Sequence, residues 1–206
     1  LDLDGTLVDS RPGIMSSLHH AFASVGRDDL LQTDLTWMIG PPFVDSFTKA
    51  GLADPHEAID AYRGHYREEG MFDAEVYAGI PAVLDFLVDR DCRLYLATAK
   101  PHAYARKITA HFGLAAKLAA EFGPELDGTR NWKGDLLRYA LELTGEDAAN
   151  AVMVGDRHHD MAAAAEVGMA SIAVSWGYGH KDEWERAHSV IDRPDALPEA
   201  IAAIAF

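Results

Sequence analysis

Two carboxylates stand at alternate positions near the start of the chain, in Asp2-Leu3-Asp4-Gly5-Thr6. Residues two apart in an extended strand point to the same face, so the side chains of Asp2 and Asp4 are predicted to share one. One carboxylate can act as a nucleophile on phosphorus. The other can protonate the leaving oxygen and then deprotonate a water molecule. Gly5 lets the backbone turn sharply just past them. The alternative is an Asp-rich turn with no chemical role.

A second acidic pair, Asp156 and Asp160, follows the apolar run 151–154. Magnesium prefers a few carboxylates, water and phosphate oxygens as ligands. Together with Asp2, this pair would complete an oxygen-ligand site whose ion neutralises phosphate charge. The alternative is a helix N-terminus with acidic caps, which Asp160 alone would suit.

Thr98 and Lys133 are two further polar residues predicted to lie at the ends of elements. Thr98 follows the apolar run 94–97, where its hydroxyl can donate to a phosphate oxygen. Lys133 precedes an amphipathic helix. Each residue alone is more often an ordinary strand-end threonine or a solvated lysine. Their joint order along the chain, Asp-x-Asp, then Thr, Lys and Asp, favours a site that handles phosphate.

The elements that would position these groups alternate along the second part of the chain. Strands are predicted at 92–97, 118–122, 151–154, 170–174 and near 190, and helices at 81–90, 101–112, 132–143, 161–167, after 174 and from 198. Strands that alternate with helices predict an α/β fold, a Rossmann-like parallel sheet covered on both faces. Such sheets bind ligands at the carboxyl ends of their strands, so the polar groups should converge on one rim.

The region before this alternation has a different pattern. Helices are predicted at 12–25, 43–50 and 54–69, and no convincing strand occurs up to Val76. We therefore predict a small all-helical domain at 12–78, inserted into an α/β catalytic core made of 1–11 and 79–206.

Together these motifs resemble the haloacid dehalogenase superfamily of phosphotransferases, over essentially the whole chain. The four motifs of that family are matched by Asp2 to Thr6, Thr98, Lys133, and Gly155-Asp156 with Asp160. Runs at 39–42, 97–101 and 126–130 are similar to its phosphoglycolate phosphatase-like branch. The family's apolar strand before the first motif is nearly absent, because the sequence begins at Leu1.

The resemblance implies a role for each matched residue. Asp2 would be the nucleophile and a metal ligand, and Asp4 the general acid and base, with its backbone carbonyl on the metal. Asp156 would be a further ligand and Asp160 a supporting or water-mediated one, and the ion would be Mg²⁺. Thr98 and Lys133 would bind phosphate and count as catalytic. The full expected substrate-binding set is Gly5, Thr6, Thr98, Ala99, Lys100, Lys133, Gly40 and Pro41.

The insert would be the family's cap domain. Gly40-Pro41-Pro42 lies between helical stretches, and it is either a cap loop that closes over the substrate or simply a rigid loop. Lys100 either supplies extra positive charge or is an ordinary strand-end lysine.

We therefore expect a Mg²⁺-dependent phosphatase that hydrolyses small-molecule phosphate monoesters, of the phosphoglycolate or nucleotide type, through an aspartyl-phosphate. A sugar-phosphate mutase on the same scaffold and a non-catalytic binding protein are the alternatives. A dehalogenase would need no carboxylate at position 4. A phosphonate hydrolase would use a cap lysine, for which the insert offers only Lys49.

The composition limits the partners. The formal net charge of −15 repels nucleic acid and anionic lipid, so we expect a small phosphorylated metabolite, no nucleic acid and no membrane. The sequence contains no apolar run long enough to span a bilayer. The single cysteine, Cys92, excludes an intrachain disulfide. The lone cysteine fits a reducing cytoplasm, and we expect a cytoplasmic protein that is a monomer or homodimer.

Overall fold

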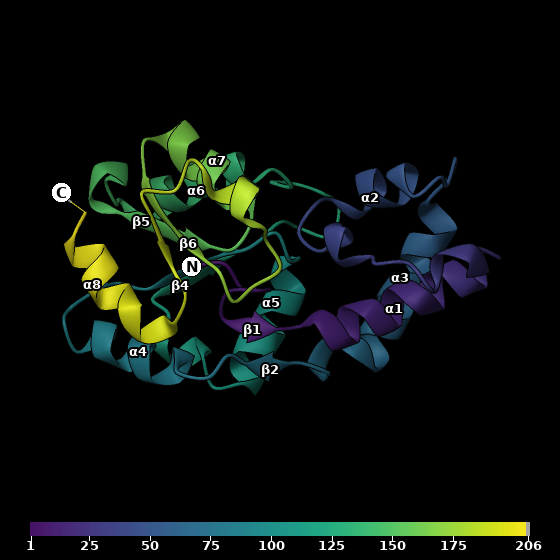
Figure 1. Cartoon of the computed structure of the whole chain (residues 1–206), viewed down its shortest axis with the longest axis horizontal. Helices are drawn as coiled ribbons and strands as arrows, with labels where there is room; N and C mark the ends of the chain where they lie inside the picture. The colour runs from purple at the N-terminus through teal and green to yellow at the C-terminus, as the bar shows by residue number, and fades with distance from the viewer. Residues whose placement is uncertain (205–206) are drawn as a thin grey trace. The chain divides into compact units, whose positions relative to one another are not determined.

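The structure is a computed structural model that describes residues 1–204 (Figure 1). Its contacts divide the chain into two units, one made of Leu1–Val8 and the chain from Val76 onward, the other of Asp9–Glu75. The second unit begins and ends slightly earlier in the sequence than the predicted insert at 12–78. Two short strands, β1 (Val8–Asp9) and β2 (Glu75–Val76), pair at these junctions. The expectation of no strand up to Val76 was therefore wrong. Strands of only two residues are too short to show an alternation of polar and apolar residues in the sequence.

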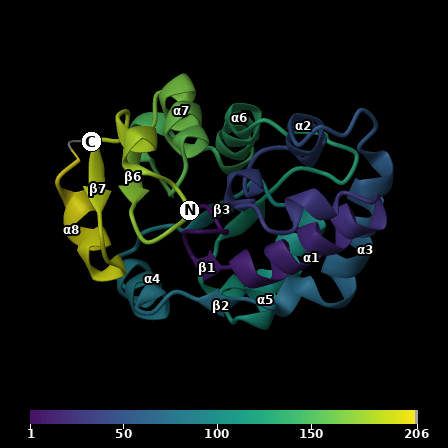
Figure 2. The ribbon, with the colours of Figure 1, turned by 45° about the vertical axis from the view of Figure 1, so that its right-hand side comes forward.

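Parallel strands form the centre of the first unit. β3 (Tyr95–Ala97) pairs with β4 (Ala120–Phe122), and β5 (Val152–Gly155) pairs with β6 (Ala170–Val174). β6 also pairs with β7 (Ser189–Ile191), and α8 (Leu197–Ala202) packs beside β7 (Figure 2). The predicted α/β class with a parallel sheet is confirmed.

The first two residues join these strands into one sheet. The Leu1 nitrogen donates to the Tyr95 carbonyl at 2.9 Å, and the Ala97 N–H donates to the Leu1 carbonyl at 2.8 Å. On the other side, the Asp2 N–H donates to the Val154 carbonyl at 2.9 Å. The backbone of residues 1–2 therefore lies between β3 and β5 and carries Asp2 to the carboxyl edge of the sheet.

Helices cover both faces of this sheet. They are α4 (Ile80–Val88), α5 (His102–His111), α6 (Lys133–Thr144), α7 (His158–Val167) and α8 (Leu197–Ala202). Figure 1 shows α6 and α7 on one side and α4 and α8 on the other. Leu137 of α6 and Ala163 of α7 pack with Met153 in the buried core. The helix predicted after 174 is instead one short 3₁₀ turn, Lys181–Trp184. Further 3₁₀ turns of this unit lie at Ala115–Lys117, Ala148–Asn150 and Pro194–Ala196.

The second unit is built on three helices, α1 (Arg11–Ser24), α2 (Phe43–Lys49) and α3 (His56–Glu68). Its 3₁₀ turns are Asp28–Leu30, Thr36–Met38 and Gly70–Phe72. Aromatic side chains fill the interior: Phe22 meets Phe47 with ring centroids 5.1 Å apart, and Tyr62 stacks on Tyr66 at 5.5 Å. Burial of such rings is the main stabilising contribution available to a unit of this size.

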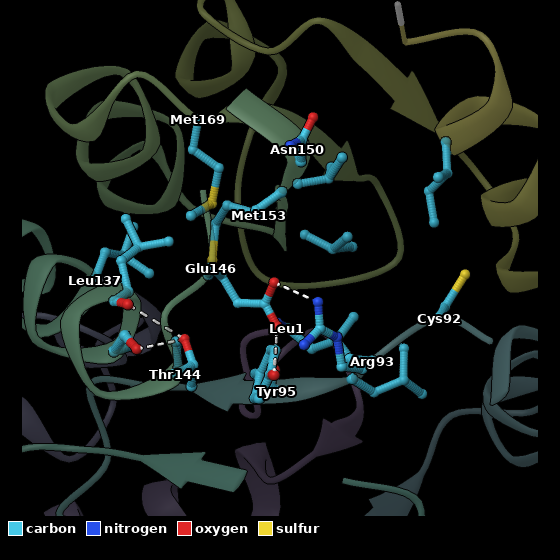
Figure 3. Close-up of a pocket in the computed structure, with 18 of the residues that line it drawn as sticks. Leu1, Cys92, Arg93, Tyr95, Leu137, Thr144, Glu146, Asn150, Met153 and Met169 are labelled. Carbon is cyan, nitrogen blue, oxygen red and sulfur yellow. Dashed lines mark hydrogen bonds and ion pairs between the residues drawn. The ribbon is translucent and has the colours of Figure 1, made fainter. Parts of the chain in front are cut away.

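A cavity of about 350 Å³ lies at the amino ends of β3 and β5. Its lining includes Leu137, Met153 and Met169, and at one side Glu146 accepts hydrogen bonds from Arg93 and Tyr95, each at 2.7 Å (Figure 3). None of the predicted acidic site residues lines it.

Among the residues that the structure describes, no helix combines the length and the apolarity needed to cross a membrane.

Close backbone contact in the second unit yields a stability prediction. A Cβ added at Gly13 of α1 would lie 1.8 Å from the Gly70 carbonyl oxygen, whereas one added at Gly64 of α3 would meet nothing within 4 Å. We expect Gly13→Ala to lower the free energy of unfolding by about 1–3 kcal/mol, because the backbone must move apart. Gly64→Ala, the matched control, should raise it by ~0.5–1 kcal/mol, since alanine favours a helix. Urea unfolding measures both, and an unchanged midpoint for Gly13→Ala would contradict the close packing.

Candidate active site

Asp2 and Asp4 begin the site, at the end of the backbone that joins β3 to β5. The Asp2 side chain is buried, and its Oδ1 accepts the Leu3 N–H at 2.8 Å. The chain then turns at Gly5, whose φ is +77°. A Cβ at Gly5 would also lie 2.4 Å from Asp156 Oδ2. Glycine is thus required there both by the turn and by the close approach of another carboxylate.

Lys133, the first residue of α6, reaches two of these carboxylates. Its Nζ lies 2.9 Å from Asp2 Oδ2 and also contacts Asp160 Oδ1. Burial alone would lower the pKa of Lys133, but the charges of Asp160 and Asp2 outweigh burial and raise it above its ordinary value. Burial alone would raise the pKa of Asp2, and the charge and hydrogen bond of Lys133 instead hold it below its ordinary value. Asp2 is therefore ionised at neutral pH and lies beside a fixed cation.

Asp2, Asp156 and Asp160 form a buried acidic cluster, with one carboxylate oxygen from each within 4.8 Å of the others. Asp156 accepts the Tyr178 N–H at Oδ2, 2.7 Å away. Burial, and then the charges of Asp160 and Asp2, raise the pKa of Asp156 to about 8. Buried carboxylates this close repel one another unless a cation offsets their charge. An all-oxygen set of this kind fits a hard divalent ion such as Mg²⁺.

Asp4 has a cation of its own. Lys100 Nζ lies 3.1 Å from Asp4 Oδ1, and the two side chains are 7% and 13% exposed. Thr98 is fully buried at the end of β3, and its Oγ1 accepts the Lys100 N–H at 3.2 Å. Thr98 also hydrogen-bonds Asp2 and helps to lower the pKa of that carboxyl group.

The structure brings most of the predicted residues together at the carboxyl edge of the sheet. A continuous series of pairwise contacts links Asp2, Asp4, Gly5, Thr6, Thr98, Lys100, Lys133, Asp156 and Asp160. Thr6 is buried, and its hydroxyl donates to Asp156 Oδ1 at 3.4 Å. The Thr6 hydroxyl thus contacts a carboxylate of the acidic cluster, and its contact with substrate stays a prediction. Ala99 is half-buried beside Thr98. Gly40 and Pro41 belong to the second unit, so their contact with substrate stays a prediction.

Sequence reasoning missed the loop after β6. Its backbone and indoles hold Asp156 and its neighbours, since Trp184 Nε1 donates to the Asp156 carbonyl at 2.7 Å and Trp176 Nε1 to the Thr6 carbonyl at 3.1 Å. A Cβ at Gly179 would lie 1.8 Å from the Asp156 carbonyl oxygen. The signal that the sequence offers there is a Gly-Tyr-Gly run at 177–179, just past the end of a predicted strand.

A half-buried histidine, His159, lies beside Asp160 in the sequence. Its Nε2 atom is buried and has no hydrogen-bond partner among the described residues. Burial, and then the charges of Lys133 and Arg157, lower the pKa of His159 to about 3. The imidazole is therefore neutral at physiological pH. It contributes no charge to the site.

Known proteins of one family are similar in sequence to this chain. The family model described as haloacid dehalogenase-like hydrolase matches residues 1–174. A 5'-nucleotidase of Pseudomonas aeruginosa is 42% identical over 91% of this chain and 86% of its own. Tyrosine-protein kinase PtkA of Mycobacterium tuberculosis is 38% identical over 92% of this chain, but this covers only 66% of that protein. Phosphoglycolate phosphatases also match, one from Rhodospirillum rubrum at 32% identity over 87% of this chain and 80% of its own.

The fold agrees as well. The crystal structure of a predicted phosphatase from Clostridium acetobutylicum superposes with a TM-score of 0.91 at 35% identity, and covers 98% of this chain and 95% of that one. The family model matches most of the sequence, several relatives are more than 30% identical, and the motif residues cluster in the structure. The chain belongs to the haloacid dehalogenase-like hydrolase family, in which its curated relatives include phosphatases.

Proposed function

We propose that this chain is a Mg²⁺-dependent phosphatase that hydrolyses small phosphate monoesters through a covalent aspartyl-phosphate on Asp2. The observation that carries the proposal is the pairing of two aspartates with two lysines at the sheet edge: Asp2 with Lys133, and Asp4 with Lys100. A nucleophile must be ionised, and the lowered pKa of Asp2 supports that role. Family membership supports hydrolysis of phosphoric monoesters.

The reaction has two steps. A carboxylate oxygen of Asp2 attacks phosphorus; the new P–O bond forms while the bond to the leaving oxygen breaks. Asp4 gives its proton to that oxygen, and the alcohol departs. Water then attacks the phosphorus of the aspartyl-phosphate, Asp4 takes a proton from the water, and inorganic phosphate leaves with Asp2 restored. One group thus acts first as acid and then as base.

The surrounding residues bind and orient the phosphoryl group. Thr98 and Lys133 both contact Asp2 and can donate hydrogen bonds to phosphoryl oxygens. Asp2, Asp156 and Asp160, with the Asp4 backbone carbonyl, would hold the magnesium ion. When bound, that ion supplies positive charge that offsets the phosphate and the charge developing in transfer.

The substrate is proposed to be a small metabolite of the nucleotide or phosphoglycolate type. Two relatives carry the names 5'-nucleotidase and phosphoglycolate phosphatase, which supports this class. The net charge of −15 disfavours nucleic acid and anionic membranes as partners. We also propose that the protein is a cytoplasmic monomer or homodimer. We further propose that the second unit serves as the cap, with Gly40 and Pro41 in the loop that contacts the leaving group.

Transfer of the phosphoryl group to an acceptor other than water is the second candidate. The observation that favours it is the kinase relative, which matches nearly the whole of this chain. A mutase would be a special case, with a sugar phosphate as acceptor. Product analysis separates these possibilities, because hydrolysis gives free phosphate whereas transfer gives a phosphorylated protein or an isomer.

Substitution of the two aspartates tests the mechanism. We expect Asp2→Asn to reduce phosphate release to background across a panel of phosphometabolites with Mg²⁺, because an amide is a poor nucleophile. Asp4→Asn should lose ~10²–10⁴-fold, the usual size of general acid–base catalysis. Circular dichroism should show that both variants stay folded. Near-wild-type turnover by Asp2→Asn would rule out the aspartyl-phosphate route.

Removal of the metal tests the acidic cluster, with thermal unfolding as a readout independent of activity. In excess chelator near pH 7, Asp156→Asn should have a higher Tm than the unsubstituted protein. Asp156 is ionised in the unfolded chain but must take up a proton when it is buried beside Asp2 and Asp160, and asparagine avoids that cost. About 1 kcal/mol shifts the Tm of a chain this size by ~2–4 °C. Added Mg²⁺ should raise the Tm of the unsubstituted protein and restore its activity, with Ca²⁺ restoring less.

The control for this experiment is Asp192→Asn, which changes an exposed carboxylate. It should keep the response to Mg²⁺, whereas Asp156→Asn should lose it. If Mg²⁺ shifts both variants equally, Asp156 is not a ligand. Full activity in excess chelator would refute the metal requirement.

A further inference from the structure

We infer that Lys100 is a positioning residue for Asp4 and does not primarily bind the phosphoryl group. This inference rests on the proposed function, since it assigns Lys100 to the acid–base arm of that reaction. The contact that carries it is the ion pair between Lys100 Nζ and Asp4 Oδ1, at 3.1 Å. By engaging Oδ1, the ammonium fixes the rotation of the carboxyl group and so the direction in which Oδ2 points.

The backbone around Lys100 is fixed on both sides, so its side chain starts from a fixed point. The Lys100 N–H donates to Thr98 Oγ1 at 3.2 Å, and the His102 N–H donates to the Pro124 carbonyl at 2.8 Å. A Cβ at Gly123 would lie 2.6 Å from the Lys100 carbonyl oxygen. The turn after β3 therefore packs tightly against the turn after β4. A lysine held in this way can orient its partner at little further entropic cost.

The two buried lysines contact different carboxylates. Lys133 contacts Asp2 and Asp160, the nucleophile and a member of the acidic cluster. Lys100 contacts Asp4, the proton donor and acceptor. Both pairs are shielded from water, and charges attract more strongly there than at the surface.

This assignment makes the effect of Lys100 depend on the leaving group. An alkoxide must receive a proton as it departs, whereas a nitrophenolate can leave without one. The ratio kcat/KM covers the steps up to the aspartyl-phosphate, so it reports this proton transfer. A lysine that bound the phosphoryl group would instead affect both kinds of ester equally, because both present the same phosphate.

The test compares Lys100→Met with the unsubstituted protein, both with Mg²⁺, on 4-nitrophenyl phosphate and on phosphoglycolate. For phosphoglycolate we expect kcat/KM to fall on the order of 10²-fold, as expected for a misplaced catalytic group. For 4-nitrophenyl phosphate the fall should be at least about tenfold smaller. Lys100→Arg keeps the charge and should recover part of the loss. Lys133→Met, the matched control, should lower kcat/KM for both esters to a similar extent.

A double substitution keeps the test valid if Lys100→Met also loosens the fold. On phosphoglycolate, Asp4→Asn with Lys100→Met should be no slower than Asp4→Asn alone, because a positioning residue has no effect once its partner is gone. Equal losses on the two esters, or additive losses in the double variant, would overturn the positioning role. Failure of the unsubstituted protein to release phosphate from either ester would overturn the phosphatase proposal, and the inference with it.

Discussion

Three backbone hydrogen bonds hold Leu1 and Asp2 between β3 and β5, and the rest of the molecule's chemistry depends on them. They join two separately paired groups of strands into one parallel sheet. Asp2 therefore stands in the middle of the carboxyl edge, where Thr98 follows β3 on one side and Asp156 follows β5 on the other. Parallel strands all end at the same edge, so residues far apart in sequence meet there without any further device.

Because the carboxylates converge, they repel one another, and the two lysines offset only part of this repulsion. Lys133 offsets Asp2 and Asp160, and Lys100 offsets Asp4, but Asp156 has no lysine beside it among the described residues. Its raised pKa is the direct consequence, because burial and two neighbouring carboxylates disfavour its charged form. A protein with a net charge of −15 has no long-range attraction for phosphate, so the positive charge has to be local. The two lysines supply part of it, and a divalent ion at the acidic cluster would supply the remainder.

Sequence patterns were informative where a contact leaves a local trace. The alternation of strands and helices predicted the parallel sheet, and the order of Asp2, Thr98, Lys133 and Asp156 predicted one shared edge. Sequence patterns failed where the role of a residue depends on a partner that is distant in the sequence. Nothing near Thr6 shows that its hydroxyl faces Asp156, and nothing near Trp184 shows that its indole holds the Asp156 carbonyl. For Lys100 the sequence left two interpretations open, extra positive charge at the site or an ordinary strand-end lysine. The distance from its Nζ to Asp4 Oδ1 favours the first.

Tight packing around Asp156 explains why the site can be both charged and ordered. Gly5, Gly177 and Gly179 approach it so closely that a single methyl group at any of them would clash with Asp156 or the backbone beside it. Fixed N–H and hydroxyl donors take the place of water around the carboxylates, so little reorganisation is needed when charge moves during phosphoryl transfer. Because these groups are fixed at the sheet edge, they can contact only the phosphoryl group of a substrate. Selection among esters must then come from residues outside this cluster, which separates the chemistry of the chain from its specificity.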